Sequence, residues 1–290
     1  MEKRLTVLIP AFNEEEGIKL TLESLIPIAK KNKWKIIVIN DGSNDNTKSE
    51  VERFGVDVLL INQPYNIGYG AALKTGIKAS ETDYIATYDA DGQHSPEDLE
   101  LLWNNIENFD MVVGKRGNDS HHDWIRKPGK WVLSKTANFL TGRRIPDLNS
   151  GMRIIRKDVI ISKLHLLSNT FSFSTTSTVA MMNMGYFVKY FPIKVRRRIG
   201  KSSVKQLKHG TSTILLILRL IVLFNPLKVF LPMSISLIVL GLIYEIIWGI
   251  VLINGIDLLP SALFLLVSGV LIFFFGLIAD QLSEIRKHNF

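Results

Sequence analysis

Two patterns of hydrophobic and polar positions divide this chain. Up to about residue 115, short apolar runs alternate with segments whose apolar positions recur at helical spacing. Such alternation is typical of a parallel sheet with helices on both faces, so this part is predicted to be an α/β domain. We expect strands at five apolar runs: Leu5–Ile9, Lys35–Asn40, Asp57–Ile61, Tyr84–Tyr88 and Met111–Val113.

Two helix starts are marked by their residue types. Asn13 is expected to cap the first helix, because Glu14–Glu16 follow it, where the helix dipole favours negative charge. Ser95 is expected to cap a later helix, since Pro96–Asp98 supply a proline and two acids in its first turn.

The second pattern is a long apolar one near the C-terminus. Residues from about 227 to 253 and from about 258 to 280 are almost wholly apolar, and each stretch exceeds the roughly 20 residues that cross a bilayer as helix. The short link Asn254–Asp257 makes the pair a hairpin with both ends on one side. Two buried core helices would need an apolar partner around their whole circumference, which this chain does not supply.

Glu245 lies inside the first of these spans, where an ionisable residue is a functional candidate. Pairing within the bundle, or with another copy of the chain, explains it equally well. A homo-oligomer is therefore one expectation.

The net charge of the chain, +8, is concentrated before the first span, and an excess of Lys and Arg marks the cytoplasmic side. Leu5–Ile9 is too short for a signal peptide, and the chain has no cysteine, which fits a reducing compartment. We expect a multi-pass protein of the cell membrane with its soluble part in the cytoplasm. Anionic lipid suits this charge better than nucleic acid, for which no motif is present. The basic residues before the span are Lys189, Lys194, Arg196, Arg197, Arg198, Lys201, Lys205 and Lys208.

Asp89 and Asp91 follow the fourth predicted strand. Residues two apart on a strand point to one face, and ligands of open α/β sheets bind at strand ends. Their hard oxygens suit Mg²⁺ or Mn²⁺, with a diphosphate supplying further ligands. A solvated turn is the plainer reading of D-x-D alone. The glycines of Gly68–Gly76 match neither a dinucleotide fingerprint nor a P-loop, and His121–His122 lack a second pair of metal ligands.

Five short motifs follow one another along the chain: Pro10–Glu14, Asn40–Ser43, Asn66–Gly68, Asp89–Gln93 and Ser95–Glu97. Together they resemble family 2 glycosyltransferases with a GT-A (nucleotide-diphospho-sugar transferase) fold, which is Rossmann-like. Two more motifs, Asp147–Arg153 and Arg197–Ser202, resemble the branch with dolichol-phosphate mannose synthases and polyprenyl-phosphate glycosyltransferases, in which a two-helix membrane anchor is known. The resemblance covers residues 5 to about 205.

The resemblance implies a division into three parts. Residues 1–185 would be a cytoplasmic GT-A catalytic domain, and residues 186–226 a basic loop followed by amphipathic membrane-surface helices, including Thr211–Phe224. Residues 227–290 would be the transmembrane hairpin.

The resemblance also implies site residues. The expected catalytic residues are Asp89, Asp91, Gln93 and Asp147, and the metal, Mg²⁺ or Mn²⁺, would bind Asp89 and Asp91. The nucleotide would contact Pro10, Ala11, Asn13, Glu14, Asp41, Asp89, Arg197, Lys201 and Ser202. The acceptor phosphate would contact Arg116, Arg126, Lys130 and Ser134.

A lipid phosphate as acceptor changes what catalysis needs. Its second pKa is about 6, so it is mostly dianionic near neutral pH and needs little base catalysis. Cations that position it matter more. Asp147 is expected near the reacting centre, where it would orient the acceptor, act as base or only cap a turn.

Two departures from the family pattern concern donor recognition. Many relatives carry two acids where this chain has Asn40 and Asp41. Relatives also often carry an acid in the stretch matching Phe171–Thr178, which here has only hydroxyls. Selection of the donor sugar is the property that these differences affect.

The expected function is inverting transfer of a hexosyl unit from a nucleotide sugar, of the GDP-mannose or UDP-glucose type, to polyprenyl or dolichyl phosphate. A processive polysaccharide synthase is disfavoured, because the chain has no Q-x-x-R-W motif and two spans are too few for a polymer channel. A non-catalytic scaffold that binds nucleotide or lipid would not need Asp89, Asp91 and Arg116.

Overall fold

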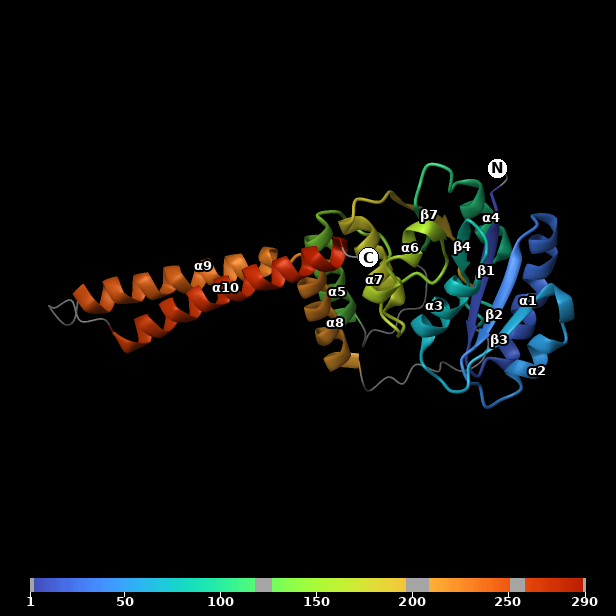
Figure 1. Ribbon diagram of the computed structural model, residues 1–290, viewed down its shortest axis with the longest axis horizontal. Helices are drawn as coiled ribbons and strands as arrows, with labels where there is room; N and C mark the ends of the chain where they lie inside the picture. Colours follow the sequence, from blue (N-terminus) through green and yellow to red (C-terminus); the bar gives the residue numbers. More distant parts are fainter. Residues whose placement is uncertain (1–2, 118–126, 197–208, 251–258, 289–290) are drawn as a thin grey trace. The chain divides into compact units, whose positions relative to one another are not determined.

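The computed structural model describes residues 3–117, 127–196, 209–250 and 259–288 (Figure 1). The chain forms two compact units, Met1–Thr213 and Ile214–Phe290. The first unit is built on a seven-stranded sheet, and the second contains a hairpin of two long helices.

The sheet of the first unit is mixed. Its strand order is β3-β2-β1-β4-β6-β5-β7, and all neighbours are parallel except β6, which runs antiparallel to β4 and β5. The parallel arrangement predicted for the first strands is confirmed for β1 to β4, whereas β6 was not predicted. The strands are β1 (Leu5–Ala11), β2 (Lys35–Asn40), β3 (Leu59–Asn62), β4 (Tyr84–Thr87), β5 (Met111–Arg116), β6 (Arg153–Arg156) and β7 (Val188–Ile193).

Helices cover both faces of the sheet, as the α/β prediction requires. The α-helices of the first unit are α1 (Glu15–Lys31), α2 (Thr47–Glu52), α3 (Tyr69–Ala79), α4 (Pro96–Asn104), α5 (Lys127–Thr141), α6 (Lys157–Ile161) and α7 (Phe173–Asn183). Short 3₁₀ turns, η1 (Gly55–Asp57) and η3 (Leu164–Leu166), join some of them.

The central strand β1 is buried along its whole length, because its alternate side chains enter two cores. Val7 and Ile9 belong to a core shared with α1 and α4, which contribute residues such as Leu22 and Leu99. Leu8 faces the other way, toward Gly76 of α3. A strand buried on both faces reads as the continuous apolar run seen in the sequence.

The start of α1 differs from the prediction. Asn13 is not the N-cap: Glu14 holds that position, and Asn13 has a left-handed backbone with φ of 53°. The Asn13 amide oxygen instead accepts the backbone N–H of Asn44 at 2.9 Å. Ser95 does precede α4, but its hydroxyl donates to Glu97 and makes no cap hydrogen bond to the backbone.

Strand β7 lies within residues that the sequence assigned to the basic membrane-surface element. Val188–Ile193 pairs with β5, so the sheet extends past residue 185, the expected end of the first domain. The expected basic loop that starts at residue 186 therefore includes a strand of the sheet at Val188–Ile193.

The second unit contains the two predicted spans as helices. They follow α8 (His209–Phe224) and are α9 (Leu227–Glu245), continued by a π-helical turn η5 (Ile246–Ile250), and α10 (Pro260–His288). Leu227–Trp248 and Pro260–Arg286 are long and apolar enough to cross a membrane, with mean hydropathies of 2.1 and 2.8. Only 11% and 17% of their most apolar windows are buried, so they are not core helices of a soluble domain.

The helices α9 and α10 pack through small residues. A Cβ atom on Gly269 would come within 2.6 Å of Ile238, and the Ser234 hydroxyl donates to the Gly269 carbonyl at 2.8 Å. Glu245 accepts the backbone N–H of Leu259 at 3.1 Å, so its carboxylate has a partner within the hairpin.

Candidate active site

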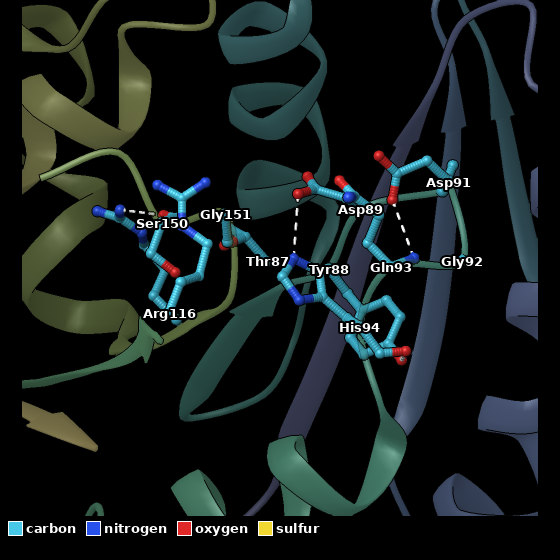
Figure 2. Close-up of polar contacts among 12 residues, drawn as sticks. Thr87, Tyr88, Asp89, Asp91, Gly92, Gln93, His94, Arg116, Ser150 and Gly151 are labelled. Atoms are coloured by element: carbon cyan, nitrogen blue, oxygen red, sulfur yellow. Dashed lines mark hydrogen bonds and ion pairs between the residues drawn. The ribbon is translucent and has the colours of Figure 1, made fainter. Parts of the chain in front are cut away.

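The candidate site lies at the carboxyl ends of the parallel strands, where ligands bind in open α/β sheets. Strand β1 leads to Asn13, β2 to Asp41, and β4 to Asp89 and Asp91. Asp89 and Asp91 were expected to point the same way because they would lie two apart on a strand. That expectation is wrong, since β4 ends at Thr87 and both aspartates lie in the following loop. Figure 2 shows this loop and the side chains around it.

Asp89 is held by hydrogen bonds from two elements. The Tyr69 hydroxyl, at the start of α3, donates to Oδ1 at 2.9 Å. Figure 2 shows the other contact, in which Nε2 of the buried His94 lies 3.2 Å from Oδ2. Tyr69 also stacks on Phe171, with ring centroids 5.3 Å apart. The carboxylate direction is thus determined before any ligand binds.

These contacts keep Asp89 ionised. Burial by itself would raise the pKa of Asp89, but the hydrogen bonds from His94 and Tyr69 and the charge of Arg116 lower that pKa below its usual range. The same burial and the neighbouring Asp89 charge raise the pKa of Tyr69, which therefore stays a neutral donor.

Asp91 and Gln93 form the second part of the loop. Asp91 is buried and accepts the backbone N–H of Gln93 at 3.2 Å. The Gln93 side-chain amide donates to the Arg196 carbonyl at 3.3 Å, which ties the loop to the chain beyond β7. Arg197, Lys201 and Ser202, which the sequence expects over the diphosphate, lie outside the described residues.

Arg116 and Asp147 form a bidentate ion pair. Arg116 Nε and Nη2 each donate to one Asp147 oxygen at 2.8 Å. Burial raises the pKa of Asp147, but the Arg116 hydrogen bonds and charge outweigh burial and lower it. Hydrogen bonding to Asp147 also raises the pKa of Arg116, so both groups stay charged.

The chain after Asp147 approaches Asp89 very closely. A Cβ atom on Gly151 would lie 2.2 Å from Asp89 Oδ2, so no larger residue fits without movement. The Thr87 hydroxyl donates to the Gly151 carbonyl and fixes this approach (Figure 2). Gly151 thereby brings the arginine–aspartate pair and the acidic loop into one place.

Arg153 is fully buried and holds the turn at Ser150 and Gly151 by hydrogen bonds. Its Nη2 donates to the Ser150 carbonyl, and Nη1 donates to the Ser174 carbonyl and to the hydroxyls of Ser177 and Thr178 at 2.8 to 3.1 Å. Burial lowers the pKa of Arg153. Hydroxyls of α7 thus solvate a buried guanidinium in the stretch where relatives often carry an acid.

The loops after β1 and β2 are joined by hydrogen bonds at the start of α1. The backbone N–H groups of Asn13, Glu14 and Glu15 donate to the side chains of Ser43, Thr47 and Asp45. Two of these donors, Glu14 and Glu15, belong to the helix start, which leaves its first N–H groups without partners inside the helix.

Asp41 is buried and shapes the entrance to α3. Its two oxygens accept the backbone N–H groups of Ile67 and Gly68, each at 2.9 Å. Burial raises the pKa of Asp41, and these two hydrogen bonds offset only part of that effect. Asp41 therefore holds a loop, whatever else it contacts.

The remaining predicted residues are only partly described. Pro10 and Ala11 are buried in β1. Ser134 lies on α5 and lines a cavity of ≈ 1190 Å³ together with Lys115, Lys135, Asn138, Phe139 and residues 142–146. Arg126 lies outside the described residues, as does the side chain of Lys130.

Three residues of the site were missed in the sequence. Two of them could have been found in the sequence: His94 directly follows Gln93, and Arg153 is the last residue of the motif Asp147–Arg153. Tyr69 carried no signal of its own, since only the fold brings α3 beside the loop after β4.

Comparison with known proteins agrees with this geometry. The family model described as Glycosyl transferase family 2 matches residues 6–162, and that described as GtrB C-terminal hairpin matches residues 225–285. An uncharacterized protein of Methanocaldococcus jannaschii is 32% identical over 198 residues, which cover 65% of this chain and 79% of that protein.

Two relatives are named as polyprenyl-phosphate enzymes. Undecaprenyl-phosphate 4-deoxy-4-formamido-L-arabinose transferase of Proteus mirabilis is 28% identical over 58% of this chain and 56% of its own length. Dodecaprenyl-phosphate galacturonate synthase of Rhizobium johnstonii is 28% identical over 54% of this chain and 48% of its own length. The chain thus spans about half the length of these two enzymes.

Solved structures of similar fold include glucosyl-3-phosphoglycerate synthase from Mycobacterium tuberculosis. Its complex with phosphoglyceric acid has a TM-score of 0.62 at 17% identity, covering 76% of this chain and 79% of that chain. Its complex with Mn²⁺, UDP-glucose and phosphoglyceric acid has a TM-score of 0.60, also at 17% identity, over the same shares of the two chains. The predicted GT-A fold is confirmed by this likeness.

Proposed function

Since this chain belongs to glycosyl transferase family 2, it is a glycosyltransferase, and we propose that it transfers a hexosyl unit from a nucleotide-diphosphate sugar to polyprenyl or dolichyl phosphate. The donor is of the GDP-mannose or UDP-glucose type, and the reaction inverts the anomeric configuration. The observation that carries the proposal is the meeting of an acidic loop and an arginine–aspartate pair across Gly151. The named relatives and the GtrB-type hairpin support a polyprenyl acceptor.

The acidic loop fits a divalent ion that shares its ligands with the donor. Asp89 and Asp91 offer hard oxygens, and the described residues contain no cluster of three metal-binding side chains. Mg²⁺ usually binds one or two carboxylates and completes its shell with substrate phosphates and water. Such an ion, when bound, stabilises the negative charge that develops on the leaving diphosphate. Tyr69 and His94 orient Asp89 for this task.

On the acceptor side, Arg116 holds the lipid phosphate and Asp147 positions Arg116. Within the described part of the chain, Arg116 Nη1 makes no hydrogen bond, whereas Nε and Nη2 are taken by Asp147. The lowered pKa of Asp147 and its engagement by Arg116 make it a poor base. A lipid phosphate is mostly dianionic near neutral pH, with a second pKa of about 6, and needs no strong base.

The membrane supplies this acceptor. We propose that the hairpin anchors the chain in the cell membrane with the first unit on the cytoplasmic side, where the nucleotide sugar is available. The excess of Lys and Arg before the first span supports this orientation. The product would be a polyprenyl-monophosphate sugar.

The test is sugar transfer by the purified full chain in detergent, with polyprenyl phosphate and a panel of GDP- and UDP-sugars. We expect transfer from one donor with Mg²⁺ or Mn²⁺, and its loss with chelator and in Asp91→Asn. Asp83→Asn is the matched control, because Asp83 precedes β4 at the opposite end of the strand and bonds Arg4 at the surface.

The other outcomes have distinct meanings. Transfer that survives chelation would remove the metal from the proposal. Products longer than one sugar would point to a processive synthase. No transfer from any donor by folded protein that still binds nucleotide would make the chain a scaffold.

A further inference from the structure

A second charged region of the first unit has no role in the proposed reaction. The cavity of ≈ 1190 Å³ beside α5 is lined by four basic side chains and, among the residues described, by no acidic one. We call it the basic pocket, and its cations are Lys115, Lys135, Arg143 and Arg144.

The cations of the basic pocket are unpaired. Within the described ranges, none of the four makes an ion pair, although many other Lys and Arg residues of this unit do. All four are exposed. Four like charges gathered around one cavity repel each other, so an anion that binds there gains from all of them.

The loop that carries two of these cations is held in place. The Ile145 backbone N–H donates to the Asn138 side chain of α5 at 2.9 Å. The Thr141 hydroxyl donates to the Ala137 carbonyl of α5 at 2.8 Å, and its oxygen accepts the Arg143 backbone N–H at 3.4 Å. Arg143 and Arg144 are thus presented on a loop bonded to the helix that forms the opposite wall.

The rim of the basic pocket is apolar and aromatic. Trp131, Lys135 and Phe139 are spaced four apart, which places them on one face of α5. Trp131 is 63% exposed and Phe139 is 55% exposed, and the Lys135 ammonium lies 5.8 Å from the Trp131 ring centre. Exposed aromatic residues beside unpaired cations are typical of surfaces at the membrane–water interface, while a soluble anion would use only the cations.

The direction of Lys115 separates the basic pocket from the reacting centre. Arg116 points to Asp147 and the acidic loop, and neighbouring residues of a strand point to opposite faces. Lys115 lines the basic pocket, whereas Arg116 is bound by Asp147.

We propose that the basic pocket binds the phosphate headgroup of an anionic membrane phospholipid, with Trp131 and Phe139 entering the interface beside it. This site is distinct from Arg116, which we propose holds the acceptor phosphate. Ser134, which the sequence places at the acceptor phosphate, lines the basic pocket instead.

The test uses the full chain in lipid nanodiscs and reads the fluorescence of Trp131. Acyl-brominated phosphatidylglycerol and acyl-brominated phosphatidylcholine are each titrated over the same range of mole fractions, since bromine quenches only a nearby indole. Subtraction of the signal of Trp131→Phe isolates this residue from the other tryptophans. We expect half-maximal quenching at a lower mole fraction of phosphatidylglycerol than of phosphatidylcholine.

Variants then assign the preference to the basic pocket. Arg143→Gln/Arg144→Gln should raise the phosphatidylglycerol fraction needed by about 5-fold for each arginine removed, since a basic residue near an anionic surface contributes about 1 kcal/mol. Lys19→Gln/Lys78→Gln is the control, because it removes the same charge from exposed lysines of α1 and α3.

Three results would overturn the inference. One is equal quenching by the two lipids, and another is the same shift in both double variants. The third is relief of the quenching by polyprenyl phosphate at a small fraction of the phosphatidylglycerol present, since the pocket would then hold the acceptor.

Discussion

The candidate active site and the basic pocket both contain charged side chains of the first unit, but these side chains differ in whether they have charged or hydrogen-bonding partners within the protein. Around Gly151, the charges of Asp89, Asp147 and Arg116 each have partners inside the protein. Around the basic pocket, the four cations make no ion pair with any described residue. Groups oriented in advance suit a reaction that needs exact geometry, whereas unpaired exposed charges suit a ligand held loosely.

Arg153 tests whether the partners of charged groups near the candidate active site stabilise the protein. Arg153→Met removes donors from buried acceptors on Ser150 and α7, which should destabilise the first unit by about 3 kcal/mol or more. Thermal unfolding of the purified chain measures the loss. Arg156→Gln is the matched control on the same strand, because its ion pairs are more exposed and should contribute about 1 kcal/mol or less. Equal losses in the two variants would mean that burial of Arg153 has no special cost.

Gly151 tests whether the close approach matters for catalysis. Gly151→Ala places a methyl group against the Asp89 carboxylate, and a displacement of about 1 Å there should lower the transfer rate about 100-fold. Initial rates at saturating donor measure the effect. Gly117→Ala is the control, since a Cβ atom there would meet nothing within 4 Å. Full activity in Gly151→Ala would show that Asp89 need not be held in place.

The pair of Asp147 and Arg116 predicts a pH dependence of stability. Because the folded-state pKa of Asp147 is lowered, its contribution is present above the unfolded-state pKa of about 3.9 and is lost as pH falls through the folded value. Asp147→Asn should therefore be less stable than the unmodified chain at pH 7, by about 2 kcal/mol, and the difference should shrink in acid. Urea unfolding at several pH values measures it. A difference that stays constant with pH would exclude the charge of Asp147 as its cause.

The smallest effect is expected in the basic pocket. Arg143→Gln/Arg144→Gln removes two exposed charges without ion-pair partners in the described chain, so unfolding free energy should change by no more than about 0.5 kcal/mol. Urea unfolding under the same conditions provides the measurement. A clear loss of stability would mean that these arginines hold the loop, and the contrast between the two regions would disappear.

Much of the fold was predictable because its signals are local. The apolar runs located β1 to β5, and the length of the two apolar stretches located α9 and α10. Strand β6 was missed because Arg153–Arg156 has arginines at both ends, one buried in the core and one paired at the surface. A charged residue that finds partners only after folding hides a strand from any pattern of hydrophobicity.

The candidate site was predictable to a similar depth. Asp89, Asp91, Arg116 and Asp147 were expected from motifs, and the structure brings them around one turn. The ion pair of Arg116 with Asp147 joins residues from different motifs, so spacing could not reveal it. Asn13 was expected to cap α1, but Thr47 and Asp45, which follow β2, accept the N–H groups of the helix start instead.

The amino-acid sequence by itself determined the family, the α/β class, the membrane hairpin and the identity of the acidic loop, because these follow from local composition and from motifs read along the chain. Only the tertiary structure decided that Tyr69 and His94 hold Asp89, that Arg153 is solvated by the hydroxyls of α7, and that four cations surround one cavity. The physical reason is that hydrogen bonds and charge interactions act over a few ångströms in space, and folding alone sets which distant residues come that close.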